Sequence, residues 1–255
     1  MMECHSTKSP VGIELLRLAG RGPLNLLGRE SFLNLNTRLD RYGGDPKTRA
    51  VIVAGTGQRA FSAGVDLLEM KELTPLEAES FIRTVHKSAR KLLTLAVPTI
   101  AAIQGPCLGG ALELALACDI RIAAEDSIFG LPEVRVGVPS VIEASLLPRT
   151  IGLGRARHML LTGDTLDAQQ ALDIGLVDRL VPKDLLLDRA FEAAQVFYGM
   201  SRDVLSLQKD IIAKWLELGE EEATEYSIKA FALNFASPHP REAMEAFLEK
   251  RQPLF

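Results

Sequence analysis

The chain has 255 residues, of which 47% are hydrophobic, and its formal net charge is −4. This length and composition predict one sizeable globular domain, or a domain with an appendage, with enough apolar residues for a buried core. The charge argues against a nucleic-acid partner, because phosphate binding needs clustered Lys and Arg, whereas both signs are interspersed here. No stretch reaches the roughly 18 to 20 apolar residues of a membrane span, so no membrane partner is expected.

The cysteine and histidine content gives no sign of a metal site. The three cysteines fit neither a disulfide framework nor a zinc site, and they favour a reducing compartment. A cytoplasmic location is therefore expected, and the first residues have neither an apolar signal core nor the pattern of a transit peptide. The four histidines lack metal-ligand spacing, which predicts surface or helix-packing roles. These residues are Cys4, Cys107, Cys118, His5, His86, His158 and His239.

Short β-rich runs alternate with amphipathic helices in the first half of the chain, which predicts an α/β fold. The predicted strands cover 11–18, 50–54, 99–104, 120–124 and 127–129, and the predicted helices cover 28–42, 75–94 and 109–118. Pro75 after Thr74 is typical of a helix start, and Pro98 disfavours continuation of that helix.

Strand signals nearly vanish after about residue 148. Helices are predicted over 165–174, 185–198, 202–218, 220–235 and 240–250. The last three contain Trp215, Phe231, Phe235 and Phe247, more aromatic surface than a thin helical layer can bury alone, so a subunit interface is expected there. The chain is divided into a core over 1–195 and a helical region over 196–255.

A glycine pattern after the predicted strand at 50–54 needs weighing. Gly55-Thr56-Gly57-Gln58-Arg59-Ala60 matches the G-x-G-x-x-A fingerprint of dinucleotide-binding folds. The match is weak, because a second turn follows where such a fold has a long helix. Taken alone, these glycines indicate a tight connection; a sharper hypothesis is that the second turn aims the Val65 N–H at a ligand.

Two glutamates follow backbone-permissive turns. Glu113 lies three residues beyond the pair Gly109-Gly110, and Glu133 ends the run Phe129-Gly130-Leu131-Pro132-Glu133. A carboxylate one helical turn beyond a glycine pair shares a face with the exposed N–H groups of the helix start, which suits a reaction through an enolate. Considered singly, each glutamate is better explained as a helix-capping residue.

Further carboxylates lie near the same turns. Asp66 belongs to the second turn, and Asp119 is predicted to be a turn residue. Glu143 interrupts the apolar stretch 138–147, where an unpaired carboxylate would be costly to bury. It is predicted to lie at the mouth of a cavity or in a salt bridge, and the sequence leaves both open.

Read together, a series of ordered motifs resembles the enoyl-CoA hydratase/isomerase (crotonase) family. The motifs are AFSAGVDL at 60–67, PTIAAIQG at 98–105, LGGALELA at 108–115, CDIR at 118–121, FGLPE at 129–133 and LTGD at 161–164. The resemblance covers roughly residues 11–250. It implies an α/β fold, a crotonase-like spiral of β-β-α units with a helical C-terminal oligomerisation region, assembled as a homotrimer or a dimer of trimers.

The resemblance also implies the chemistry of the site. The substrate would be an acyl-CoA thioester whose carbonyl is held in an oxyanion hole formed by the N–H groups of Val65 and Gly110, with Glu113 and Glu133 as catalytic residues. The coenzyme A site would include Ala63, Val65, Asp66, Leu67 and Gly110. No metal or redox cofactor is implied, since coenzyme A is part of the substrate.

Two departures from the family pattern affect substrate binding. Many relatives carry a lysine shortly after the position of Asp66, where this chain has Leu67-Leu68, so other basic residues would have to hold the nucleotide phosphates. The candidates are Arg59, Lys71, Lys250 and Arg251. The Gly-rich stretch that follows the second glutamate in hydratases is replaced here, which makes Val138 and Glu143 candidate residues of a reshaped acyl pocket.

The leading prediction is an enoyl-CoA hydratase that adds water to a 2-enoyl-CoA in the syn sense, because both glutamates are present. The alternative is a Δ3-Δ2-enoyl-CoA isomerase, which needs one carboxylate to carry a proton and no water. A thioester hydrolase or carbon–carbon lyase of the same family, and a non-catalytic acyl-CoA-binding member, are further alternatives.

Overall fold

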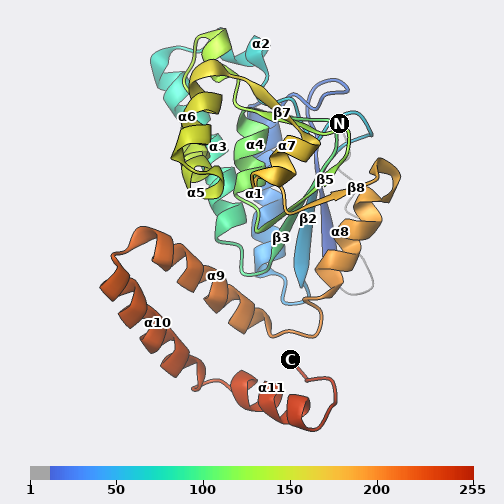
Figure 1. Ribbon diagram of the computed structural model, residues 1–255, viewed down its shortest axis with the longest axis vertical. Coiled ribbons are helices and arrows are strands. Elements are labelled where there is room, and N and C mark those ends of the chain that lie inside the picture. The colour runs from blue at the N-terminus through green and yellow to red at the C-terminus, as the bar shows by residue number, and fades with distance from the viewer. Residues whose placement is uncertain (1–11) are drawn as a thin grey trace.

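A five-stranded parallel sheet runs through the structure, a computed structural model that describes residues 12–255 (Figure 1). Its strands lie in the order β1-β2-β3-β5-β8, with bounds Ile13–Leu18, Ala50–Gly55, Thr99–Ile103, Ile120–Ala124 and Arg179–Val181. Strands β2 and β3 are buried along their whole length, as expected for the continuous apolar runs of a parallel sheet. The predicted strand start at Val11, and Cys4 and His5, lie outside the described residues.

A smaller sheet lies beside the first and carries the site. It has the order β4-β6-β7, with bounds Pro106–Leu108, Ile128–Gly130 and Thr165–Asp167; β4 and β6 are parallel, and β7 is antiparallel to β6. The chain passes from β3 of the large sheet to β4 of the small one, and again from β5 to β6, and each pair is followed by helical structure. This is the repeated β-β-α spiral that was expected.

Helices cover both faces of the large sheet. Helices α1 (Arg29–Gly44), α3 (Pro75–Leu93) and α4 (Gly110–Leu116) pack on one face, where the rings of Phe32 and Phe81 meet edge to face at 6.0 Å. Helix α8 (Leu186–Gln195) covers the other face and contacts the alternate side chains of the strands (Figure 1).

Several short elements connect these layers. They are α2 (Leu67–Met70), the 3-10 helices η1 (Glu133–Val136), η2 (Ile142–Leu146) and η3 (Lys183–Leu185), and α5 (Leu147–Ile151), α6 (Leu153–Thr162) and α7 (Ala168–Asp173). The prediction of one helix over 165–174 was partly wrong. Its first three residues form β7, because they pair with β6, and α7 begins only after Asp167, whose side chain accepts a hydrogen bond from the Gln170 N–H.

Three C-terminal helices extend away from the core: α9 (Arg202–Glu217), α10 (Glu220–Asn234) and α11 (His239–Leu248) (Figure 1). All three were predicted from the sequence. Lys209 of α9 is anchored to the core, since its Nζ lies 2.6 Å from Asp119 Oδ2 and also donates to the carbonyl of Val97. The division of the chain after residue 195 stays a prediction. No helix within residues 12–255 combines the length and apolarity that a membrane crossing requires.

Candidate active site

The turn that follows β2 runs alongside β4 and delivers Val65 to the start of α4. Ser62 N–H donates to the Pro106 carbonyl and Leu108 N–H to the Ser62 carbonyl, both at 3.1 Å. These two hydrogen bonds hold the turn against β4, although the two segments are distant in the sequence. A Cβ added to Gly110 would lie 3.2 Å from Val65 Cγ2, so the two residues are neighbours.

The N–H groups of Val65 and Gly110 are both available to a ligand. Neither donates a hydrogen bond to any group within residues 12–255. For Gly110 the reason is its place at the first position of α4, whose N–H groups have no partner inside the helix. Val65 lies between two residues that bond to Leu27: the Gly64 carbonyl accepts from the Leu27 N–H, and the Asp66 N–H donates to the Leu27 carbonyl. The hypothesis that the second turn presents the Val65 N–H to a ligand fits this geometry.

Glu113 is buried one turn into α4. Its exposed fraction is 4%, and its Oε1 accepts a hydrogen bond of 3.0 Å from the Ala144 N–H. Burial raises the pKa of Glu113 to about 8; the Ala144 N–H opposes that rise, and the nearby Glu133 and Glu143 carboxylates add to it. Glu113 is therefore a carboxyl group that can exchange a proton near neutral pH.

Glu133 approaches the same glycine turn from the second β-β-α unit. Because β4 and β6 pair in parallel and Gly109 N–H donates to the Gly130 carbonyl, the residues after both strands lie side by side. A Cβ on Gly109 would stand 2.7 Å from Glu133 Oε1, so the Glu133 carboxylate lies against this glycine. Glu133 Oε2 accepts a hydrogen bond of 2.8 Å from the Ser140 hydroxyl. The structure thus brings Glu113 and Glu133 together at Gly109–Gly110.

Glu143 is in a salt bridge, one of the two arrangements that the sequence left open. Its Oε1 lies 2.8 Å from Nδ1 of His86, a half-exposed residue of α3. Burial raises the pKa of Glu143, and His86 and Arg90 oppose that rise. No local pattern identifies His86 as the partner, because the two residues lie on separate elements without shared local spacing. Val138, the other candidate acyl-pocket residue, is half-buried.

The predicted coenzyme A loop is fixed by an ion pair that sequence reasoning missed. Arg21 donates to both carboxylate oxygens of Asp66, at 2.6 and 2.8 Å, and lowers the pKa of that carboxyl. Asp66 also caps α2 through the Leu68 N–H, while Ala63 is half-buried and Leu67 is exposed.

Among the basic residues suggested as phosphate ligands, two already have acidic neighbours. Arg251 is bound by Glu242 and Glu249, and Lys71 lies 3.2 Å from Glu72. Within residues 12–255 there is no group of three or more His, Cys, Asp or Glu side chains placed to hold a metal ion.

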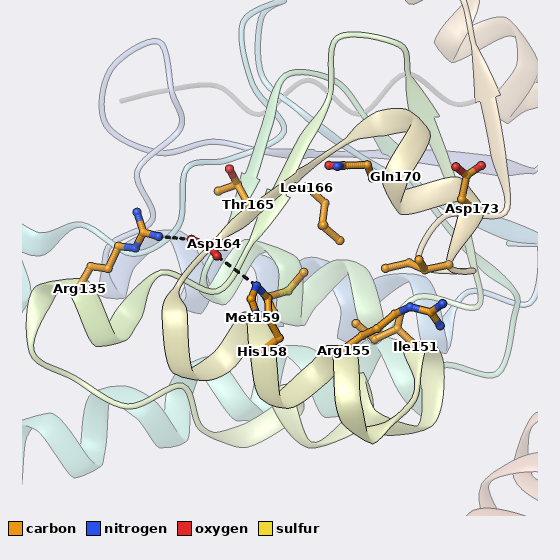
Figure 2. Close-up of a pocket in the computed structure, with 11 residues that line it drawn as sticks. Arg135, Ile151, Arg155, His158, Met159, Asp164, Thr165, Leu166, Gln170 and Asp173 are labelled. Carbon is orange, nitrogen blue, oxygen red and sulfur yellow. Dashed lines mark hydrogen bonds and ion pairs between the residues drawn. The ribbon is translucent and has the colours of Figure 1, made fainter.

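A separate cavity of about 620 Å³ is lined by residues of η1, α5, α6, β7 and α7 (Figure 2). Figure 2 shows Asp164 between Arg135 and His158, at 2.5 Å from Arg135 Nη2 and 3.1 Å from His158 Nε2. Neither Glu113 nor Glu133 lines this cavity. Because Arg135 belongs to η1, the Arg135–Asp164 pair supports the element that carries Glu133.

Comparisons with known proteins agree with this architecture. Residues 8–255 match the family described as enoyl-CoA hydratase/isomerase. The short-chain-enoyl-CoA hydratase of Clostridium acetobutylicum is 34% identical over 230 residues, which cover 90% of this chain and 88% of that protein. The crotonyl-CoA hydratase of Syntrophomonas wolfei is 34% identical over 233 residues, which cover 91% of this chain and 90% of that protein.

Solved structures show the same likeness. The crystal structure of an enoyl-CoA hydratase from Bacillus anthracis superposes with a TM-score of 0.90 at 31% identity, covering 96% of this chain and 95% of that one. The spiral of β-β-α units with its helical C-terminal region is therefore the crotonase fold, as predicted. The chain belongs to the enoyl-CoA hydratase/isomerase family.

Proposed function

We propose that this protein is an enoyl-CoA hydratase that adds water reversibly to a 2-enoyl-CoA thioester. The observation that carries the proposal is the meeting of Glu113 and Glu133 at one glycine turn, beside the free N–H groups of Val65 and Gly110. These N–H groups would bind the thioester carbonyl oxygen and stabilise the enolate that forms from it. One donor of an oxyanion hole typically contributes about 3 to 4 kcal/mol to the transition state.

The two carboxyl groups would share one water molecule. One carboxylate takes a proton from the water as its oxygen adds to Cβ, and the other carboxyl gives a proton to Cα on the same face of the double bond. The pKa of Glu113 near 8 supports this exchange, because such a group can both hold and release a proton near neutral pH. A metal ion or redox cofactor is not part of the proposal.

Coenzyme A would bind along the turn that ends in α2. Ala63, Val65, Asp66, Leu67 and Gly110 form the proposed coenzyme A site, and the Arg21–Asp66 pair would hold the shape of that turn. Val138 and Glu143 lie on the segment that follows Glu133 and are the proposed acyl-pocket residues.

Crotonyl-CoA hydration by Glu113→Gln and Glu133→Gln variants tests the proposal. Each substitution keeps the size of the side chain but removes its ability to exchange a proton, so we expect turnover to fall by at least ~10²-fold. Binding of coenzyme A, measured by calorimetry, should stay close to that of the unaltered protein. Near-normal hydration by either variant would rule out the two-glutamate mechanism.

A Δ3-Δ2-enoyl-CoA isomerase is the second candidate, because the matched family includes isomerases. This reaction would need one carboxyl group and no bound water. Incubation with 3-enoyl-CoA beside 2-enoyl-CoA separates the two activities: a hydratase produces 3-hydroxyacyl-CoA from the 2-enoyl substrate, whereas an isomerase converts the 3-enoyl substrate without adding water.

We also propose that the protein works as a homotrimer or a dimer of trimers in the cytoplasm. Exposed aromatic side chains on α9 to α11 support the assembly, since large apolar groups on a free surface favour association. The buried free thiols Cys107 and Cys118 support a reducing compartment.

A further inference from the structure

Glu143 and His86 form an ion pair next to the proposed catalytic residue Glu113, and the proposed reaction does not use it. His86 comes from the middle of α3, and its Nδ1 lies 2.8 Å from Glu143 Oε1. The carboxylate is buried, while the imidazole is half-exposed. Glu143 Oε2 is buried as well and has no hydrogen-bond partner among the described residues. A carboxylate in this position is costly, and an apolar side chain would fill the same space at lower cost.

The backbone before Glu143 is strained. Ile142 has a φ of +46°, in the left-handed region that β-branched residues rarely adopt. Conformations of this kind are costly and persist only where neighbouring contacts impose them. The ion pair between Glu143 and His86 provides such a contact, because it joins the strained segment η2 to helix α3 one residue beyond Ile142.

The same segment supplies the hydrogen bond that orients Glu113. The N–H of Ala144 donates to Glu113 Oε1 at 3.0 Å, and Ala144 is itself buried. Because Ala144 directly follows Glu143, a movement of the Glu143 backbone displaces this N–H. A displacement of about 1 Å at a catalytic group can reduce a rate on the order of 10²-fold.

We propose that Glu143 and His86 are positioning residues for Glu113. Their ion pair fixes η2 against α3, and η2 in turn presents the Ala144 N–H that sets the direction of the Glu113 carboxyl group. This inference rests on the proposed role of Glu113 in hydration. It gives Glu143, a proposed acyl-pocket residue, a second role through the backbone, and it adds His86, which acts through Glu143.

The charges around the pair predict a second effect. The carboxylates of Glu143 and of Glu133, on η1, both raise the pKa of Glu113. His86 and Arg90, on α3, oppose the rise in the pKa of Glu143 itself. Removal of the charge at Glu143 should therefore shift the titration of Glu113 to lower pH.

Two substitutions at one position separate geometry from charge. Glu143→Ala removes the anchor, and we expect kcat for crotonyl-CoA to fall roughly 10- to 100-fold, a larger change than any in KM. Glu143→Gln retains an oxygen that can accept from His86, so it should recover most of kcat at its own pH optimum. His158→Gln is the matched control, because His158 also pairs with a carboxylate, Asp164, but on the surface.

Unchanged kcat in Glu143→Ala, or the same loss in the Ala and Gln variants, would overturn the positioning role. A circular-dichroism melt of each variant identifies loss by unfolding. If Glu143→Ala does not fold, His86→Ala breaks the same contact from its half-exposed side, and an unchanged kcat in that variant would overturn the positioning role.

Carbon-13 NMR of protein labelled at the Glu side-chain carboxyl provides a readout that needs no turnover. The Glu113 resonance is identified by its loss in Glu113→Gln. Its titration midpoint should move to lower pH in Glu143→Gln and stay in place in His158→Gln; a midpoint that does not move in Glu143→Gln would contradict the inference. A wild-type protein that fails to hydrate any 2-enoyl-CoA would contradict the proposed function instead, and the NMR titration would still test the pair.

Discussion

Glu113 retains its proton to unusually high pH because its carboxyl group lies in the apolar interior. Burial is the main cause that raises its pKa to about 8. In the unfolded chain the same group would release its proton near the ordinary value for Glu, about 4.3. Between these two pH values the folded protein binds the proton more tightly than the unfolded chain does. The contribution of Glu113 to stability is therefore complete below the lower value and is lost as the pH rises toward the upper one.

Glu113→Gln should remove this pH dependence. We compare the change that the substitution makes in the free energy of unfolding at pH 8 and at pH 5. This change should be more stabilising at pH 8, by on the order of a few kcal/mol. Urea denaturation at both pH values measures the difference. Glu125→Gln, at an exposed position, is the control and should have the same small effect at each pH. An equal effect of Glu113→Gln at the two pH values would show that the carboxyl group is not proton-bound in the folded state.

At the scale of single residues, the sequence pointed to candidate site residues but not to their partners. Glu113, Glu133 and Gly110, which the structure places at one turn, became candidates because their motifs are local and ordered along the chain. His86 was missed as the partner of Glu143, and Arg21 was missed as the partner of Asp66, since each ion pair joins elements that only the folded backbone brings together. A local pattern contains no information on such contacts.

At the scale of elements, the start of α4 depends on two glycines for different reasons. Gly109 has φ 57° and ψ −134°, a conformation essentially restricted to glycine, and a Cβ there would lie 2.7 Å from Glu133 Oε1. Gly110 lies in helix α4, whose backbone conformation any residue can adopt, but a Cβ there would lie 3.2 Å from Val65 Cγ2. The first glycine permits the turn, and the second keeps space between the two free N–H groups.

Alanine at each position should separate these roles. Gly109→Ala is expected to lower the free energy of unfolding by about 1 to 3 kcal/mol and to reduce kcat, because it strains the turn and displaces Glu133. Gly110→Ala should cost little stability, since alanine favours helix, but should lower kcat/KM for crotonyl-CoA by crowding the carbonyl site. Thermal unfolding and steady-state kinetics measure both. Equal stability losses in the two variants would contradict the assignment.

The elements that were predicted are those with long periodic or apolar runs. Strands β2, β3 and β5 and helices α1, α3 and α9 to α11 follow their predicted ranges closely. The three-residue strands β4, β7 and β8 were missed, because so short a segment shows no period and is defined by its neighbours in the sheet. This matters for the site, since the pairing of β4 with β6 is what brings Glu133 to the start of α4.

At the scale of the whole molecule, the C-terminal helices leave large apolar side chains on the surface. Trp215, Phe231, Phe235 and Phe247 are all exposed, and the rings of Phe231 and Phe235 contact each other edge to face at 5.2 Å. The sequence predicted that one chain would not bury all of these aromatic side chains, because their spacing exceeds what a thin helical layer covers. What covers them depends on a partner surface that one sequence does not specify.

Association should therefore weaken when charge is placed on this surface. Phe247 is 82% exposed in the single chain, so Phe247→Glu should leave the fold of each chain intact while it lowers the molar mass measured by light scattering toward that of one chain. Leu76→Glu is the matched control, because Leu76 is 78% exposed but lies on α3, away from the C-terminal helices. If the wild type has the mass of a single chain, or if both variants retain the wild-type mass, the exposed aromatics of α9 to α11 do not form the subunit interface.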